Sequence, residues 1–251
     1  EMTREIVVVT AAYGSDRVRE LGGQAALLPV IAKAGADSVE IRRELFDTLS
    51  LTELPALGDT IAHHQLGCVY SVPEALFRED GALHTGLESF FLEAQQLGAR
   101  VMKLSLGHYR PGTNLSALKK VLDAQPVRLV VENDQTPDCG ILLPMSAFLR
   151  AASDAGLPLG MTFDMGNWHW VGQAPHCAAD TLADHVTYVH VKAATRHAGK
   201  WQAVALDNSD GQWRELLNRL PMDAPRGIEF PLEGDDLIAV TRHYVDLLRA
   251  E

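Results

Sequence analysis

Four short apolar segments in the second half of the chain each end on a side chain that can bind a metal ion. These side chains are Glu132, Asp164, His190 and Glu229. They are separated by 32, 26 and 39 residues, and each separation is close to the length of one strand-plus-helix unit. Four neighbouring parallel strands that end on these residues would direct all four side chains to one place.

Three carboxylates that converge without a cation would repel one another, whereas a divalent cation makes the same arrangement stable. Three carboxylates with one imidazole and no thiolate suit Mn²⁺, Mg²⁺ or Co²⁺ better than a structural zinc site. We therefore predict one bound divalent metal ion, with Mn²⁺ as the first expectation.

The elements that would position these residues follow an alternating pattern. Short runs rich in β-branched residues recur along the chain, and a stretch with helical periodicity follows each of them. The eight expected strands are Glu5–Thr10, Ser38–Arg42, Cys68–Ser71, Val101–Leu106, Arg128–Asn133, Met161–Asp164, Val186–Val191 and Gly227–Phe230. The expected helices are Gln24–Ala34, Leu51–His64, Leu87–Leu97, Leu115–Leu122, Pro144–Ala155, Ala178–Ala183, Trp213–Leu220 and Leu237–Arg249.

This pattern predicts a single (β/α)₈ TIM barrel over residues 1–251. The length of 251 residues matches about 31 residues for each of eight units. An open doubly wound sheet is the alternative, but it usually begins with a glycine-rich phosphate-binding turn, and Thr10–Ser15 contains one glycine. We find no linker or low-complexity segment that indicates a second domain.

The composition excludes several functional classes. The net charge of −11 repels phosphate backbones, so we expect neither nucleic acid nor an anionic membrane as a partner. No apolar run approaches the roughly 18 residues that span a bilayer. Three widely spaced cysteines and the lack of an apolar leader at the start of the chain favour a reduced, cytoplasmic protein with a small-molecule ligand.

The segments around the four predicted ligands resemble the xylose-isomerase-like sugar isomerase/epimerase superfamily, near its ketose 3-epimerases. The segments are Val130–Gln135, Thr162–Trp168, Tyr188–Lys192 and Ile228–Pro231. The resemblance implies that Glu132, Asp164, His190 and Glu229 are the metal ligands and that Glu132 and Glu229 also form the catalytic acid/base pair. It is compatible with a homo-oligomer.

The resemblance also implies substrate-binding residues. Arg196 lies six residues beyond the histidine, and Asp138 lies six residues beyond the first glutamate, as in family members. Asn167 stands where some epimerases have histidine, and Ala193 stands where aspartate is frequent. These differences do not alter the resemblance to the superfamily, but they leave the substrate open.

Three further residues are candidates for substrate contact because of their side-chain type and position, independently of the resemblance. Lys103 would contact a substrate oxygen or neutralise the acid cluster. Glu40 would contact the ligand or form an ion pair at the barrel rim with Arg42. Trp168 would form a wall of the pocket or pack in the interior.

A C–H group next to a carbonyl is too weak an acid for a carboxylate to ionise unless a metal ion stabilises the resulting enediolate. Two glutamates on separate strands would remove and return the proton, so the expected activity is isomerisation or epimerisation of a small ketose or keto-sugar acid. The acidic loop Pro231–Asp236 favours an unphosphorylated substrate.

Three other functions compete with this activity. A dehydratase of the 3-dehydroshikimate type would use the same ligand set. A sugar-binding barrel without turnover has no need of two glutamates placed for proton transfer. A DNA-repair endonuclease would need further histidines on the middle strands, and the expected third strand ends at Tyr70–Pro73 without one.

Overall fold

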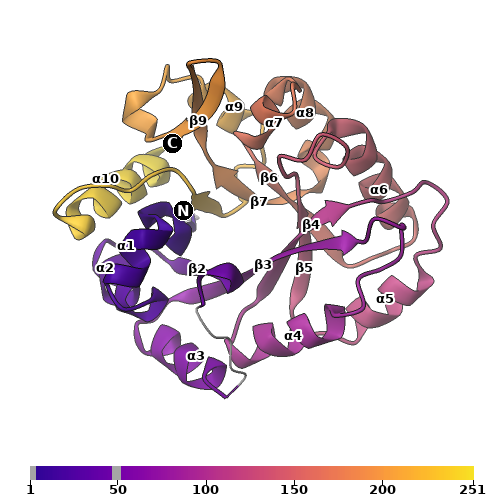
Figure 1. Ribbon diagram of the computed structural model, residues 1–251, viewed down its shortest axis with the longest axis horizontal. Helices are drawn as coiled ribbons and strands as arrows, with labels where there is room; N and C mark the ends of the chain where they lie inside the picture. The colour runs from indigo at the N-terminus through magenta and orange to yellow at the C-terminus, as the bar shows by residue number, and fades with distance from the viewer. Residues whose placement is uncertain (1–3, 47–51) are drawn as a thin grey trace.

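Eight parallel strands close into a barrel in the computed structural model, which describes residues 4–46 and 52–251 (Figure 1). The order around the barrel is β1-β10-β7-β6-β5-β4-β3-β2. The barrel strands are β1 (Ile6–Val9), β2 (Ser38–Arg42), β3 (Gly67–Phe77), β4 (Val101–Gly107), β5 (Arg128–Glu132), β6 (Leu159–Asp164), β7 (Val186–Val191) and β10 (Arg226–Ile228). The predicted TIM-barrel fold is confirmed, and β2 and β7 have the predicted bounds.

The strands form because their β-branched and apolar residues are buried between the barrel interior and the surrounding helices. All four residues of β1 are buried, for example. The register of strand pairing sets the position of the polar strand ends along the barrel axis. Asp164 pairs with His190, and His190 pairs with Gly227 on the other side. The ends of β6, β7 and β10 therefore lie side by side.

Helices surround the barrel in Figure 1. They are α1 (Ser15–Glu20), α2 (Leu28–Lys33), α3 (Leu54–His63), α4 (Leu87–Gln96), α5 (Ser116–Asp123), α6 (Leu142–Asp154), α7 (Asn167–Trp170), α8 (Pro175–Leu182), α9 (Trp213–Asn218) and α10 (Leu237–Ala250). Leu51, the first residue of one predicted helix, lies outside the described residues. The predicted helix Gln24–Ala34 is divided into a 3₁₀ turn and α2, where Pro29 occupies the first turn. Among the described residues, no helix is long and apolar enough to cross a bilayer.

Strand β3 is longer than predicted. It continues past Ser71 to Phe77, and its pairing with β4 shifts register between Ser71 and Ala75. Pro73 lies within this irregularity, where a residue without an N–H group is tolerated. The predicted end at Ser71 was wrong, and the extension adds no histidine.

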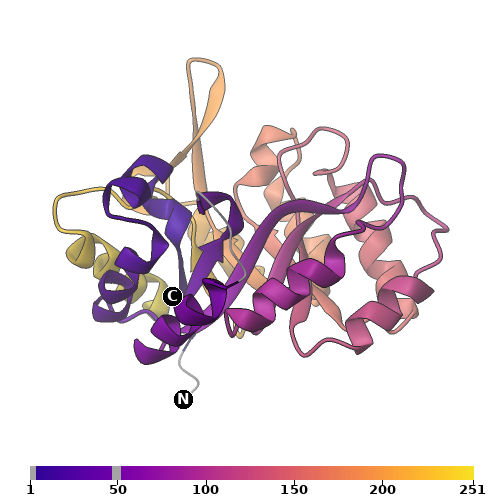
Figure 2. The same ribbon diagram turned by 60° about the horizontal axis from the view of Figure 1, so that its bottom comes forward.

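The sequence pattern missed α1, α7 and a two-stranded hairpin. Strands β8 (Ala193–His197) and β9 (Lys200–Val204) pair antiparallel directly after β7. Ala198 and Gly199 between them have φ values of 50° and 78°, as a two-residue type I′ turn requires. The hairpin rises away from the barrel in Figure 2, and its partly exposed residues lack the apolar run used to find strands.

Candidate metal centre

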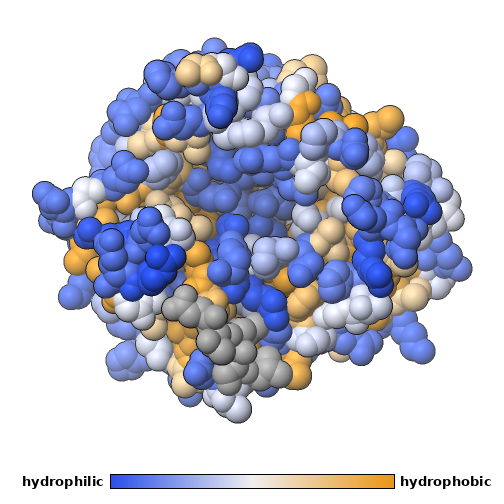
Figure 3. All heavy atoms as spheres, viewed as in Figure 1, coloured by the Kyte–Doolittle hydropathy of each residue, from blue (hydrophilic) through white to orange (hydrophobic). Residues whose placement is uncertain are grey.

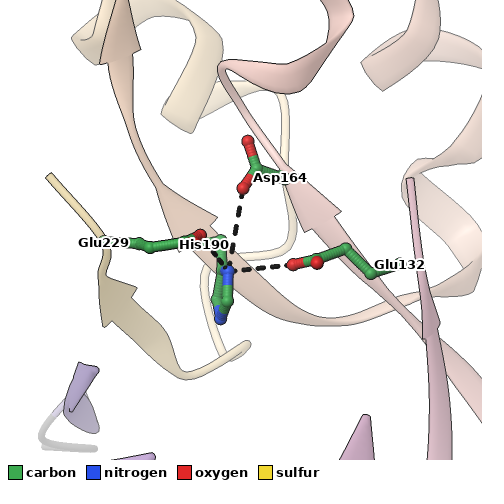
Figure 4. Close-up of side chains that lie close together, drawn as sticks. All are labelled: Glu132, Asp164, His190 and Glu229. Carbon is green, nitrogen blue, oxygen red and sulfur yellow. Dashed lines mark ion pairs between the residues drawn. The ribbon is translucent and has the colours of Figure 1, made fainter. Parts of the chain in front are cut away.

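The barrel brings the four predicted ligands together. Glu132 ends β5, Asp164 ends β6, His190 lies in β7, and Glu229 directly follows β10. One ligand atom from each residue lies within 4.8 Å of the others, and Figure 4 shows the three carboxylates directed at the His190 ring. Hydrophilic side chains gather in the hollow at the centre of the same face (Figure 3).

The atoms that face one another are buried and lack ordinary partners. His190 Nδ1 lies 2.5 Å from Glu229 Oε2, 2.9 Å from Glu132 Oε2 and 3.7 Å from Asp164 Oδ2. None of these four atoms has a hydrogen-bond partner of acceptable geometry among the described residues. Buried polar atoms are normally satisfied, so four unpaired atoms at one point fit the donor set of a divalent cation.

Local hydrogen bonds hold the Asp164 carboxylate in place. Its Oδ1 accepts hydrogen bonds from the backbone N–H groups of Gly166 and Asn167, each at 2.9 Å. The Asn133 side chain accepts from the backbone N–H of Asp164 at 2.9 Å and donates to its carbonyl at 3.1 Å. These contacts join β6 to the segment after β5 and leave Asp164 Oδ2 directed at His190.

A fourth carboxylate, that of Glu40, orients His190 from the opposite end of the ring. Glu40 Oε1 lies 2.7 Å from His190 Nε2, and both side chains are fully buried. The Tyr188 hydroxyl donates to the same Glu40 oxygen at 2.9 Å. A proton on Nε2 that donates to Glu40 leaves Nδ1 with a free lone pair for a metal ion.

Each carboxylate of the cluster also has a cationic neighbour. Lys103 Nζ donates to Glu132 Oε1 at 2.9 Å. Lys192 Nζ lies 3.6 Å from Asp164 Oδ2, and Arg42 lies 3.4 Å from Glu229 Oε1. The three cations offset much of the repulsion among the acids before any metal ion binds.

These neighbours shift the ionisation of the two glutamates. Burial alone would raise the pKa of Glu132, but the charges of Lys103 and His190 outweigh it and lower the pKa to about 2. Burial opposes ionisation of Glu229 as well, yet Lys192, His190 and Arg42 hold its pKa well below the ordinary value. Both glutamates are therefore ionised at neutral pH.

Asp164 and His190 shift in the other direction. Burial raises the pKa of Asp164, and the neighbouring Glu229 adds to this. Burial would lower the pKa of His190, but the carboxylates of Glu40, Glu229 and Glu132 together hold it well above the ordinary value. A protonated His190 would therefore supply positive charge to the three carboxylates when no metal ion is bound.

The residues predicted to bind substrate lie at different distances from this cluster. Lys103 contacts Glu132, and Asn167 is buried beside Asp164, with its Oδ1 accepting from Lys192 at 3.1 Å. Glu40 is fully buried behind the His190 ring, where its side chain contacts His190 and Tyr188 and forms an ion pair with Arg42 at 3.3 Å.

The other three predicted residues lie elsewhere. Trp168 was expected either to form a wall of the pocket or to pack in the interior, and it packs: it is fully buried, with its ring centroid 5.5 Å from that of Phe163. Arg196 is exposed on β8, where its guanidinium lies 5.8 Å from the Trp201 ring. Asp138 is exposed in the loop after β5.

The sequence reasoning missed Lys192, Tyr188 and Asn133, and it gave Arg42 a minor place. The sequence did carry a signal for Tyr188 and Lys192. Side chains alternate between the two faces of a strand, so both residues lie on the same face as His190. The same alternation places Arg42 beside Glu40. Asn133 carried no such signal, since it follows the end of its strand.

Comparison with solved structures shows which proteins share this fold. The IOLI protein, crystallised with a bound zinc atom, superposes with a TM-score of 0.73 at 12% identity, over 98% of each chain. An L-ribulose 3-epimerase gives 0.66 at 17% identity, over 99% of this chain and 95% of the other. The probable 3-DHS dehydratase AsbF from Bacillus anthracis gives 0.66 at 11% identity, over 97% and 98%.

No protein-family model and no curated protein matches the sequence. The similarity therefore lies in the architecture, over nearly the full length of both chains in each pair. The chain has the fold of the xylose-isomerase-like TIM barrels, a group of structures that includes ketose 3-epimerases.

Proposed function

We propose that this protein is a divalent-metal-dependent enzyme that isomerises or epimerises a small ketose or keto-sugar acid. The observation that carries the proposal is the convergence of four buried, unpaired ligand atoms at the carboxyl ends of the barrel strands. Active sites of TIM-barrel enzymes lie at this end. The three carboxylates and one imidazole favour Mn²⁺, with Mg²⁺ or Co²⁺ as alternatives.

A metal ion held by this cluster would polarise a substrate carbonyl and stabilise the charge that develops on its oxygen. Glu132 and Glu229 approach His190 from opposite sides in Figure 4. Their low pKa values keep both ionised, so one can take a proton from the carbon beside the carbonyl. The other glutamate would take a proton from solvent or from a substrate hydroxyl and deliver it to the opposite face, which would invert that carbon, while the first glutamate gives its proton to solvent.

The cationic and amide groups around the cluster would orient the substrate. Lys103 contacts Glu132. Lys192 contacts Asp164 and Asn167. They can donate to substrate hydroxyl or carboxylate oxygens. Arg196 and Asp138 remain candidates for contacts made when a substrate is bound.

A dehydratase is the second candidate, because the fold is shared with a probable 3-DHS dehydratase. Ionisation of the same C–H group followed by loss of hydroxide from the next carbon would give a lyase. A sugar-binding protein without turnover is less favoured, since binding alone does not require two ionised glutamates on opposite sides of the ligand site.

The test is solvent exchange. Metal-stripped and Mn²⁺-loaded protein would be incubated in D₂O with ketoses, keto-sugar acids and 3-dehydroshikimate, and deuterium incorporation and products followed by NMR. We expect metal-dependent deuterium incorporation beside the carbonyl with a ketose or keto-sugar acid. Glu132→Gln should lose it, and Glu233→Gln, which changes an exposed acid outside the cluster, should keep it.

Three outcomes would contradict the proposal. Dehydration without epimerisation or isomerisation would assign the lyase. Tight Mn²⁺ binding without exchange in any compound would favour a binding protein. Equal exchange with stripped protein would remove the metal ion from the chemistry.

A further inference from the structure

A cavity of about 250 Å³ lies beside the metal centre, between the β8–β9 hairpin and helices α7, α8 and α9. Its floor is apolar and buried, and includes Met165 and Trp213. Its rim is polar, with Ser209 and the exposed side chains of Asp210 and Gln212. The volume lies just below the range of about 300–1,000 Å³ that holds drug-sized ligands, so it suits one small ring.

The walls are aromatic. Trp201 from β9 stacks on His169 from α7, with ring centroids 4.5 Å apart and planes 30° apart. Trp213 is 5% exposed and held by the α9 packing. Aromatic walls offer a large apolar surface at low entropic cost, and the polar rim can exchange hydrogen bonds with hydroxyl groups. A sugar ring combines apolar C–H groups with hydroxyl groups, which matches this lining.

One side chain joins the cavity to the metal centre. Lys192 lines the cavity, and its Nζ lies 3.6 Å from Asp164 Oδ2 and 3.1 Å from Asn167 Oδ1. A Cβ atom at Gly166 would come within 2.6 Å of Lys192 Cδ, so the glycine makes room for the lysine chain. The cavity therefore begins within the length of one lysine side chain from a predicted metal ligand.

We propose that this cavity is a second sugar subsite, and that the substrate is a keto sugar that carries a glycosyl group. The open-chain sugar unit that bears the carbonyl lies at the metal centre, and the glycosyl ring passes Lys192 and occupies the cavity between Trp201 and Trp213. The inference rests on the proposed function for the first sugar unit and on the cavity for the second.

The experiment compares one-ring and two-ring ketoses on the Mn²⁺-loaded protein. Deuterium exchange would be measured for D-fructose, for its 4-O- and 6-O-glucosyl derivatives, and for 6-O-benzyl fructose. We expect a KM at least about tenfold lower for one of the glucosyl derivatives than for fructose. Ala194→Phe should remove the preference, because Ala194 lines the cavity. Gln202→Phe, which introduces the same side chain at an exposed position of the same hairpin, should keep it.

A second measurement does not depend on catalysis. Methyl glucoside would be titrated into the metal-free protein and followed by tryptophan fluorescence, since Trp201 and Trp213 both line the cavity. We expect a saturable change that Ala194→Phe abolishes and Gln202→Phe retains.

The outcomes separate the two proposals. Exchange with equal KM for all compounds would overturn the subsite and leave the proposed function intact. A preference for the benzyl derivative over both glucosyl derivatives would overturn the sugar assignment. If no compound exchanges, the proposed function fails, and the methyl glucoside titration decides alone: a saturable change lost in Ala194→Phe supports the subsite, and its absence overturns it.

Discussion

Glu40 Oε1 lies 2.7 Å from His190 Nε2, at the end of the imidazole opposite to the three predicted carboxylate ligands. The two residues belong to β2 and β7, and both are fully buried. The contact determines which ring nitrogen is protonated and therefore which one faces the metal centre.

Replacement of Glu40 should weaken metal binding without removing a ligand. In Glu40→Gln the amide can still contact Nε2, but it no longer holds the ring with a charge. We expect affinity for Mn²⁺ to fall by about 10- to 100-fold, measured by competition with a chelator. Glu44→Gln removes a carboxylate that contacts Arg42 at 2.8 Å and should leave the affinity nearly unchanged. Equal affinity in both variants would show that Glu40 does not orient His190.

Asp164→Asn should raise the stability of the metal-free protein and abolish metal binding. The asparagine oxygen can keep the backbone hydrogen bonds of Gly166 and Asn167, while its NH₂ group replaces the ligand oxygen. Since burial raises the pKa of Asp164, the charged form is unfavourable without a cation. We expect the metal-free variant to be more stable by about 1 kcal/mol in urea unfolding, with Mn²⁺ affinity lost. A destabilised metal-free variant would contradict this account.

Metal binding should release a proton. The pKa of His190 is held well above its ordinary value in the metal-free protein, so the ring is protonated at neutral pH and its Nδ1 proton must leave. We expect about one proton released per Mn²⁺ at pH 7, from calorimetry in two buffers of different ionisation enthalpy.

The direction of the pH dependence follows from the same shift. A raised folded pKa contributes stability that is fully present below the unfolded pKa and is lost as pH rises through the folded value. The metal-free protein should therefore gain less from added Mn²⁺ at pH 6 than at pH 8, measured as the shift in Tm. An equal Tm shift at both values would contradict a protonated His190.

Gly227→Ala should disturb the metal centre through steric contact. A Cβ atom at this position would lie 2.5 Å from the Tyr188 hydroxyl, which donates to Glu40. We expect a loss of about 1–3 kcal/mol in urea unfolding, together with weaker Mn²⁺ binding.

Gly160→Ala provides the matched control for this prediction. Its Cβ atom would clash with the exposed Thr187 side chain, outside the Glu40 contact. It should lose stability without a comparable loss of Mn²⁺ affinity. A similar loss of affinity in both variants would mean that general destabilisation is the cause.

Several features of this protein could be predicted from local sequence. The strands were visible because buried parallel strands need continuous β-branched and apolar runs, and β2 and β7 were predicted to the residue. The four converging residues were visible because each ends such a run at the spacing of one strand-plus-helix unit. Both features repeat along the chain, so neither required knowledge of distant contacts.

The tertiary structure alone decided the remaining features. Glu40 and His190 are 150 residues apart, and only closure of the barrel makes them partners. The pairing of neighbouring strands places Lys103 beside Glu132 and Lys192 beside Asp164. The hairpin with Arg196 escaped prediction because its half-exposed strands lack an apolar run. Sequence determined which side chains reach the end of each strand, and packing determined which atoms meet there, because hydrogen bonds and ion pairs depend on distances between segments far apart in the chain.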